Sequence, residues 1–472
     1  MAGKTSTFAL FFGNRGFFPA SLMAAARAEL PRVLHEWGYD TLMMDEGATR
    51  FGAVETTREG QAYADFLQRH RGEFDGVILS LPNFGDENGA MAALKDAGVP
   101  IFIQAYADEM DKMAPEQRRD SFCGKLSIMD VFAQCGIKFS IGRPHVVMPN
   151  STAFRANVEH FDRVCRVVKG MKHLTVGALG ARTTPFKTVR FDEIALQRYG
   201  VTTESLDFSE VLARAGKVSA AEPAYRAKAD VLRAYTRWEG VPDAAFENAV
   251  KMGVVLDQII EEYQLDALAI RCWTEVQQQL GICVCVLLGE LNDRGIAAAC
   301  EVDVCNAVLM QALRLASGQP AACLDWNNNF EDDDDKCILF HCGPVPASLM
   351  AGQGQVIENP ILATTLGPNC SYGCNVGRIA PGHFTFGSLI TDAGTVRCYV
   401  GEGRFTADTI PAEFFGCAGV AHIEGLQDVL IHIGRNGYRH HVSLTPGQYA
   451  PAVREALGYY LDYAVEDPQQ GV

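Results

Sequence analysis

The stretch IAAACEVDVCNAVLMQALRLASGQPAACLDW (residues 296–326) contains the alternation that sets the fold class. Its first part, IAAACE, is a short apolar run that predicts a strand, and PAACLDW at its end predicts another. The segment NAVLMQALRLASGQP between them has helical spacing, and Gly318 and Pro320 are typical stop signals. A strand, a helix and a second strand in this order indicate a parallel sheet that is covered by helices.

The same alternation continues on both sides of this stretch. Strands are predicted upstream at LTVGALG (174–180) and LDALAIRCWTE (265–275), and KCILFHC (336–342) follows downstream. The first third of the chain alternates in the same way, whereas after about residue 350 Gly-rich turns separate β-rich runs, which favours antiparallel strands. We therefore expect an α/β fold with two parallel-sheet domains and a smaller, mainly antiparallel β domain at the C-terminus. The expected boundaries are 1–168, 169–348 and 349–472.

Composition argues against several classes of protein. The 472 residues carry a net charge of −16, which repels phosphate backbones, so a nucleic-acid partner is not expected. No apolar run reaches membrane-spanning length, and the N-terminus lacks a secretory pattern, so no membrane association is expected. The 15 cysteines have no regular spacing and often lie in apolar segments such as GICVCVLLG (281–289), which is typical of reduced thiols. These features predict a cytoplasmic protein.

Polar residues end four predicted strands of the second domain, where a parallel sheet presents groups to ligands. Carboxylates and imidazoles together suit a divalent ion such as Mn²⁺, Mg²⁺ or Co²⁺, and no CxxC pair indicates structural zinc. Each of these residues on its own is more often a helix cap or a surface group. The strand-ending residues are Glu275, Glu301, Asp325 and His341, and the later loop GRNGYRHHVSL adds His440 and His441.

Several motifs resemble those of the L-fucose/L-arabinose isomerase family, which are metal-dependent aldose–ketose isomerases. Residues 296–326 resemble a fucose isomerase segment in which a ligand glutamate is followed, one helix and one strand later, by a ligand aspartate. RCWTE (271–275) resembles the family's RHWTD, and GYRHHVSL (437–444) resembles its GAHHTV and GANHGV sequences. ILFHCG (338–343) resembles an arabinose-type strand with an extra ligand histidine. The chain is shorter than fucose isomerases and lacks the END that follows their glutamate.

The resemblance implies a catalytic metal centre. Glu301 and Asp325 would bind the metal and transfer the proton between C2 and C1 of an open-chain sugar, through a cis-enediol(ate). His441 would be a third ligand, with His440 as the alternative, and His341 is a candidate fourth ligand. The expected cofactor is Mn²⁺, with Mg²⁺ or Co²⁺ as alternatives.

The resemblance also implies a shared site. The loop GNRGFFP (13–19) is similar to a family loop that reaches the active site of a neighbouring subunit. We therefore expect a homo-oligomer, a hexamer by resemblance, in which one subunit completes the pocket of another. The expected substrate-binding residues are Arg15, Phe84, Trp273, His440 and Arg439.

The substrate class stays open at this point. A pentose, a 6-deoxyhexose or a 6-deoxy-6-sulfo sugar such as sulfoquinovose would fit, and Arg15, Arg182 or Arg439 could meet a sulfonate. A cytoplasmic sugar-binding protein without catalysis is the alternative, because two α/β domains also make a binding cleft. A nicotinamide-dependent dehydrogenase would need a GxGxxG fingerprint, which GALGAR (177–182) does not match.

Overall fold

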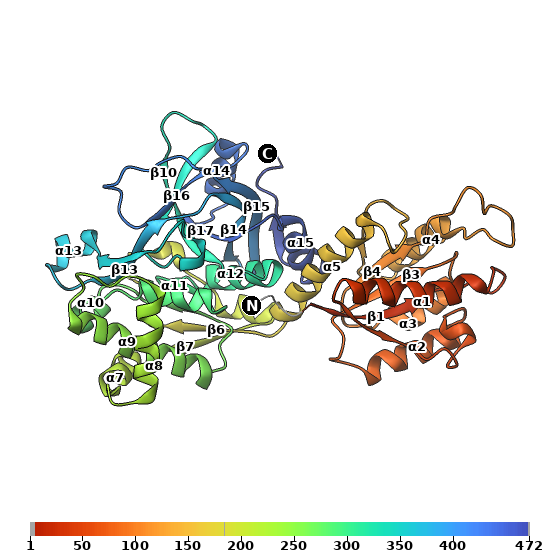
Figure 1. Cartoon of the computed structure of the whole chain (residues 1–472), viewed down its shortest axis with the longest axis horizontal. Coiled ribbons are helices and arrows are strands. Elements are labelled where there is room, and N and C mark those ends of the chain that lie inside the picture. The colour runs from red at the N-terminus through yellow and green to blue at the C-terminus, as the bar shows by residue number, and fades with distance from the viewer. Residues whose placement is uncertain (1–4, 184, 471–472) are drawn as a thin grey trace. The chain divides into compact units, whose positions relative to one another are not determined.

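The computed structural model describes residues 5–183 and 185–470. The chain divides into two compact units, residues 1–169 and residues 170–472, whose elements are labelled in Figure 1. Within the described residues, no helix combines the length and the apolar character that a membrane crossing requires.

The first unit is built on a five-stranded parallel sheet with the strand order β2-β1-β3-β4-β5. Successive side chains of β1 alternate between two apolar clusters: Phe8 and Leu10 pack with helices α1 and α5, and Ala9 and Phe11 pack with α2, α3 and α4. Both faces of the sheet are therefore buried, as is usual for parallel sheets. The elements are β1 (Thr7–Phe12), α1 (Ser21–Glu36), β2 (Asp40–Met43), α2 (Thr57–Arg69), β3 (Gly76–Leu81), α3 (Glu87–Leu94), β4 (Ile101–Ala105), α4 (Ser121–Gln134), β5 (Ser140–Ile141) and α5 (Thr152–Met171).

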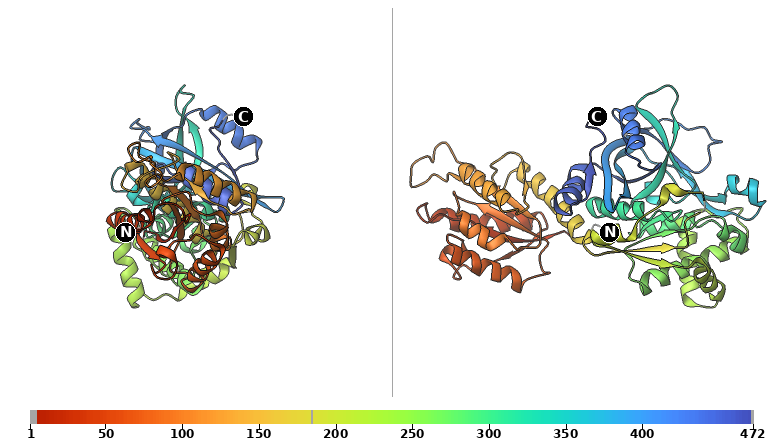
Figure 2. Two further views of the ribbon diagram at one scale, coloured as in Figure 1. Left: turned by 90° about the vertical axis from the view of Figure 1, so that its right-hand side faces the viewer. Right: turned by 180° about the vertical axis from the view of Figure 1, so that it is seen from behind.

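The second unit begins with a four-stranded parallel sheet in the order β7-β6-β8-β9. Helices α7, α8 and α9 pack on one face of this sheet, and Figure 2 shows these green helices along the yellow-green strands in the view from behind. The elements are β6 (Leu174–Leu179), α6 (Glu193–Arg198), β7 (Val201–Leu206), α7 (Phe208–Lys217), α8 (Pro223–Tyr235), α9 (Asp243–Glu262), β8 (Ala267–Ile270), α10 (Glu275–Leu280), α11 (Cys285–Asp293), β9 (Ala297–Cys300) and α12 (Val304–Ser317).

The rest of the second unit is a nine-stranded, mostly antiparallel sheet in the order β12-β13-β16-β11-β10-β17-β14-β15-β18. Among the described strands of this sheet, only the pairs β13–β16 and β15–β18 are parallel. The elements are β10 (Ala322–Asn329), β11 (Lys336–His341), β12 (Gln355–Glu358), α13 (Pro360–Leu366), β13 (Tyr372–Arg378), β14 (Gly382–Asp392), β15 (Thr395–Phe405), β16 (Cys417–His422), α14 (Leu426–Arg435), β17 (His441–Pro446), α15 (Ala450–Arg454) and β18 (Ala464–Glu466).

Helix α12 connects the two sheets of the second unit. It contacts β6, β8 and β9 of the parallel sheet and β14 and β17 of the antiparallel sheet. Its side chains are therefore buried almost all round, which explains why its sequence is apolar on more than one face. The predicted fold class, two parallel-sheet α/β regions followed by a mainly antiparallel region, is confirmed.

The placement of two strands differs from the sequence prediction. PAACLDW and KCILFHC were expected in the second parallel sheet, but β10 and β11 pair antiparallel with each other and with β17 and β16. The prediction was wrong because a strand–helix–strand pattern does not say whether the chain returns to the same sheet, and α12 carries it across to another. This crossing places Asp325 beside His441 on neighbouring antiparallel strands.

Candidate active site

Glu301 occupies a strained turn at the carboxyl end of the parallel sheet. It directly follows β9, and Glu301 and Val302 both have left-handed backbone, with φ of 61° and 59°. Non-glycine residues rarely adopt this conformation, and those that do gather at functional sites. The turn leads to Asp303, whose side chain accepts a hydrogen bond from Asn306 N and caps α12.

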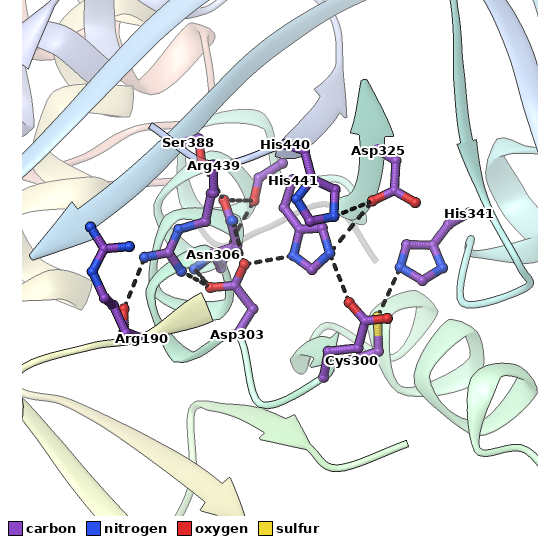
Figure 3. A network of polar contacts seen from close by, with 12 residues as sticks. Arg190, Cys300, Asp303, Asn306, Asp325, His341, Ser388, Arg439, His440 and His441 are labelled. Carbon is purple, nitrogen blue, oxygen red and sulfur yellow. Dashed lines mark hydrogen bonds and ion pairs between the residues drawn. The ribbon is translucent and has the colours of Figure 1, made fainter. Parts of the chain in front are cut away.

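The antiparallel sheet brings the other predicted ligands to the same place. Asp325 of β10 and His441, the first residue of β17, are direct register partners. His341 is the last residue of β11, the neighbour of β10 on its other side. Figure 3 shows His441 in the centre of the network, with Asp303 on one side and Asp325 and His341 on the other.

Three buried atoms of this group face one another without a hydrogen-bond partner. His441 Nε2 lies 2.9 Å from Glu301 Oε2 and 3.5 Å from Asp325 Oδ1. None of the three atoms makes a hydrogen bond of acceptable geometry to any described residue. Buried polar atoms are nearly always satisfied, so three that converge indicate a missing ligand. Two carboxylate oxygens and one imidazole nitrogen form a donor set that fits a divalent cation such as Mn²⁺.

A buried carboxylate fixes the orientation of His441. Asp303, which has no exposed surface, lies with Oδ2 2.7 Å from His441 Nδ1, and its Oδ1 accepts a hydrogen bond from Arg439. Burial alone would raise the pKa of Asp303, but the charge of Arg439 and the hydrogen bond with His441 hold it well below its usual range. The ionised Asp303 must accept the hydrogen bond, so His441 carries a proton on Nδ1 and turns Nε2 towards Glu301 and Asp325. Burial acts to lower the pKa of His441, but contacts with Cys323, Asp303 and Glu301 raise it well above its usual value, so Nε2 would release a proton on binding a cation.

In His341, Nδ1 accepts a hydrogen bond, whereas in His441 Nδ1 donates one. The backbone N–H of Cys342 donates to His341 Nδ1 at 2.9 Å. A neutral ring that accepts at Nδ1 carries its proton on Nε2. That nitrogen lies 2.9 Å from Cys300 Sγ, and it is also close enough to Asp325 and His441 for these three residues to form one candidate metal group.

The two carboxylates at the centre differ in the direction of their pKa shifts. Burial raises the pKa of Asp325 above its usual range, although nearby His341 and His441 act against this. Burial also acts to raise the pKa of Glu301, but the contact with His441 Nε2 at 2.9 Å and the charge of that ring outweigh it and lower the pKa. Neighbouring carboxyl groups with separated pKa values are typical of acid–base pairs.

Aromatic side chains line the approach to Glu301 and His441. Trp273 Nε1 donates to Glu301 Oε1 at 3.1 Å. The half-buried ring of Phe186 lies 5.7 Å from the Trp273 ring and 5.3 Å from that of His440, both edge-on. His440 is more exposed than His441, and its Nε2 lies 3.6 Å from Asp325 Oδ1. Trp273 and His440 thus lie at the site, in positions that a substrate could contact.

Two other predicted residues of the second unit have partners of their own. Arg439 is almost fully buried, and its guanidinium donates to Asp303 and to Arg190 O, behind His441. Glu275 pairs with Arg271 at 2.5 Å. Arg15 and Phe84 belong to the first unit.

In the first unit, Arg15 and Phe84 contact each other. The Arg15 guanidinium lies 4.4 Å from the centre of the Phe84 ring, donates to Gly85 O at 2.7 Å and pairs with Glu87. Next to it, Phe17 is 80% exposed. The loop therefore presents an arginine with an apolar neighbour, and its role in substrate binding stays a prediction.

Sequence reasoning missed two residues of the site, Asp303 and Phe186. The position of Asp303, two residues after Glu301 and before a helical segment, indicates a helix cap, and this residue is indeed the cap of α12. Its second role at His441 joins residues 138 positions apart, so no local pattern could reveal it. Phe186 lies in a loop after β6 that has no recognisable motif.

Comparison with known proteins gives two family matches. Residues 9–172 match the family described as fucose/sulfoquinovose isomerase, N-terminal domain, and residues 339–467 match L-fucose isomerase, C-terminal domain. His341 and His441 lie within the second match, whereas Glu301 and Asp325 lie between the two.

Curated relatives carry the name sulfoquinovose isomerase. The chain is 23% identical over 285 residues to the protein of Alkalicoccus urumqiensis, covering 60% of this chain and 63% of that protein. It is 24% identical over 327 residues to that of Priestia aryabhattai, covering 68% and 69%. It is 28% identical over 229 residues to that of Clostridium sp. (strain MSTE9), covering 48% and 50%. Together with the two domain matches in sequence order, these similarities show that the chain belongs to the fucose isomerase family.

Proposed function

We propose that this protein is a divalent-metal-dependent aldose–ketose isomerase with Mn²⁺ as its cofactor. The observation that carries the proposal is the convergence of Glu301 Oε2, Asp325 Oδ1 and His441 Nε2, three buried atoms without a hydrogen-bond partner among the described residues. Mg²⁺ and Co²⁺ would accept the same donors. Membership of a sugar isomerase family supports the reaction class.

The two carboxylates would share the proton transfer. One takes the proton from C2 of the open-chain aldose, and the C2–H electron pair becomes the C1–C2 double bond of a cis-enediol(ate). The proton is then delivered to C1, and the hydroxyl proton moves from O2 to O1, so that C2 becomes the carbonyl carbon. A bound divalent cation would stabilise the negative charge that develops on O1 and O2. We assign these roles to Glu301 and Asp325.

The proposal gives the two histidines different tasks. Asp303 holds the proton of His441 on Nδ1, so its Nε2 is available as a metal ligand. His341 carries a proton on Nε2 in either protonation state. In the neutral ring the backbone of Cys342 donates to Nδ1, and, although burial acts to lower the pKa of His341, nearby Cys342 and Asp325 raise it to about 9. A nitrogen that carries a proton cannot coordinate a metal, so we assign His341 to a hydrogen bond with a sugar oxygen.

We propose a 6-deoxy-6-sulfo sugar, sulfoquinovose, as the substrate, with sulfofructose as the product. The support comes from three relatives that carry the name sulfoquinovose isomerase. Of the three arginines considered for the sulfonate, Arg439 is bound to the buried Asp303 and Arg15 pairs with Glu87. Arg182 also has a partner, because it donates to Thr183 O at 3.3 Å. It lies on the loop after β6 that also carries Phe186, and we assign the sulfonate to it on the ground of this position.

A panel of matched sugars tests both the reaction and the substrate. Metal-stripped protein would be incubated with Mn²⁺ and either sulfoquinovose or quinovose, which differs only by lacking the sulfonate, and ketose formation would be followed by NMR. We expect turnover of sulfoquinovose that depends on Mn²⁺ and is much slower with quinovose. Equal rates for both sugars would contradict the sulfonate assignment, and binding without any ketose would indicate a sugar-binding protein instead.

We further propose a cytoplasmic homo-oligomer, a hexamer by resemblance, in which Arg15 of one subunit reaches the substrate of another. The exposed Phe17 beside Arg15 supports an interface, because aromatic residues and arginine are enriched there. All fifteen cysteines are free thiols, which supports a reducing compartment. Mixing Arg15→Ala and Glu301→Gln subunits after dissociation tests the sharing: activity should return in reassembled hybrids. A mixture that stays inactive would exclude a role of Arg15 in a neighbour's site.

A further inference from the structure

A row of four basic side chains crosses the antiparallel sheet of the second unit. β15 pairs with β16 as well as with β14, so the strands β16-β11-β10-β17-β14-β15 form a closed ring. The register places His383 of β14 opposite Arg404 of β15, Arg404 opposite His422 of β16, and His422 opposite Lys336 of β11. Register partners point to the same face of a sheet, so these four side chains lie side by side.

This basic row lies at a different end of the strands from the candidate active site. Lys336 is the first residue of β11, whereas His341, which belongs to the candidate site, is the last residue of the same strand. A strand rises about 3.3 Å per residue, so the length of β11 separates the two places by roughly 17 Å. The basic row is therefore not part of the site already described.

Of the four basic side chains, Lys336 alone has acidic partners. Its Nζ lies 3.0 Å from Asp408 Oδ2 and 3.2 Å from Asp333 Oδ2. Among the described residues, the other three basic side chains make no hydrogen bond or ion pair. The guanidinium of Arg404 is always charged, and each imidazole carries at least one N–H. The row thus presents three neighbouring hydrogen-bond donors without an acceptor.

The three side chains without acceptors line a cavity of about 460 Å³. This volume lies within the range of small-molecule pockets, which is roughly 300–1,000 Å³. Another part of the wall comes from α15 and from the residues after β18, with Arg454 and Gln470. The cavity therefore offers both basic groups and amides to a small ligand.

Most acidic side chains of the cavity have partners of their own. Glu402 Oε1 accepts a hydrogen bond from Ala450 N at 3.0 Å, and Asp467 Oδ2 lies 3.1 Å from Arg454 Nη1. Glu424 is exposed and is the one acidic side chain in the described lining without a hydrogen bond or ion pair. Three basic donors thus face a single carboxylate that has no partner.

We propose that this cavity binds a phosphate group, either as free phosphate or as the phosphate ester of a small metabolite. Arg404 is the middle residue of the three donors, and its planar guanidinium can bind two phosphate oxygens at once. Neighbouring strands are about 4.8 Å apart, so His383 and His422 flank it on either side and can donate to a further oxygen. A carboxylate offers only two oxygens to such a set. The amide of Gln470 would meet the hydroxyl groups of an attached sugar.

Calorimetric titration of the full chain tests the proposal. The titrants are glucose 6-phosphate, inorganic phosphate and glucose, which lacks the phosphate, all in a chloride buffer. We expect both phosphates to bind at one site per chain and glucose to bind far more weakly. Tighter binding of glucose 6-phosphate would support recognition of an ester, and equal binding of the two phosphates would support a site for the free anion. Binding of neither phosphate, or equal binding of glucose and glucose 6-phosphate, would overturn the proposal.

Variants of the cavity locate the bound phosphate. Arg404→Gln should weaken its binding by about 10–100-fold, the range for hydrogen bonds to a charged group, and Arg404→Lys should weaken it less. Arg435→Gln makes the same change at an exposed arginine of α14 that does not line the cavity, and should have no effect. Glu424→Gln removes the carboxylate without a partner and should strengthen binding, a gain that misfolding cannot produce. Equal affinities in Arg404→Gln and Arg435→Gln would contradict the proposal.

Glu301→Gln separates this cavity from the candidate active site, where phosphate could bind a catalytic cation. The variant should bind phosphate as the unaltered protein does, whether or not the proposed isomerase activity is correct. Loss of phosphate binding in Glu301→Gln, with binding retained in Arg404→Gln, would place the phosphate in the active site and reject the proposed cavity.

Discussion

Both compact units bury charged side chains, but among the described residues only the second unit has buried charged groups with atoms that make no hydrogen bond. In the first unit, the buried Lys125 ammonium donates to His145 O at 2.8 Å. Asp162 accepts from Ser6 N at 2.9 Å and pairs with Arg166 at 3.0 Å. Each of these charged groups therefore has a hydrogen-bond or ion-pair partner within the first unit.

In the second unit, charged groups from three different segments meet at one point. Glu301 follows a strand of the parallel sheet, Asp325 and His441 belong to the antiparallel sheet, and their facing atoms make no hydrogen bond to described residues. Burying such groups without partners costs several kcal/mol each unless something compensates. A functional site is therefore distinguished by several buried charged groups that meet without hydrogen-bond partners, and not by the burial of a single charge.

Glu301→Gln is the strongest test of this convergence. The change keeps the shape of the side chain but removes its charge, and with it a proposed metal ligand and proton carrier. We expect turnover to fall by roughly 10²–10⁴, the range for general acid–base catalysis. The circular dichroism spectrum should not change. Turnover close to that of the unaltered protein would remove Glu301 from the site.

The two histidines provide the next test. His441→Ala should lower Mn²⁺ affinity strongly, because it removes a proposed ligand whose Nε2 faces the other two proposed ligands. His341→Ala should leave Mn²⁺ affinity nearly unchanged and raise KM, because its Nε2 carries a proton. Calorimetric titration of both variants with Mn²⁺ measures the difference. Equal losses of affinity would show that His341 is also a ligand, as the resemblance to arabinose isomerases implies.

Asp303→Asn tests the hydrogen bond between Asp303 and His441 Nδ1. The amide cannot balance the charge of Arg439, and it holds the proton of His441 on Nδ1 less firmly. Losses of outer partners of metal-binding histidines typically reduce metal affinity or activity by roughly 10–100-fold. We expect a loss in this range in Mn²⁺ titrations, at temperatures where the melting curve shows a folded protein. An unchanged affinity would leave Asp303 with its helix-capping role alone.

The sequence predicted the fold class, and it predicted which residues come together at the candidate site, because both depend on local signals. That these residues bind a metal stays a prediction. Apolar runs predict strands, and Glu301, Asp325 and His441 lie in motifs that resemble those of a family. It could not predict which sheet β10 joins, since that depends on the direction in which α12 leaves the turn at Glu301.

The smallest expected effect concerns the isolated charge of the first unit. Burial lowers the pKa of Lys125 to about 8, whereas the unfolded chain has the ordinary value of 10.5. Between these two pH values the unfolded state binds the proton that the folded state has released, so stability rises with pH, by at most about 1.4 kcal/mol per pH unit. Below pH 8 both states are protonated and the contribution no longer changes.

Lys125→Met removes this titration, and the other groups titrate alike in both proteins. Urea unfolding of the two proteins should therefore show a stability difference that is constant below about pH 8. Between about pH 8 and 10.5 the difference should shift in favour of the unaltered protein. If the difference stays constant up to pH 10, Lys125 remains charged in the folded state. Its hydrogen bond to His145 O would then compensate fully for the burial of the charge. The two units would then differ only in that buried charged groups converge at one point in the second unit and not in the first.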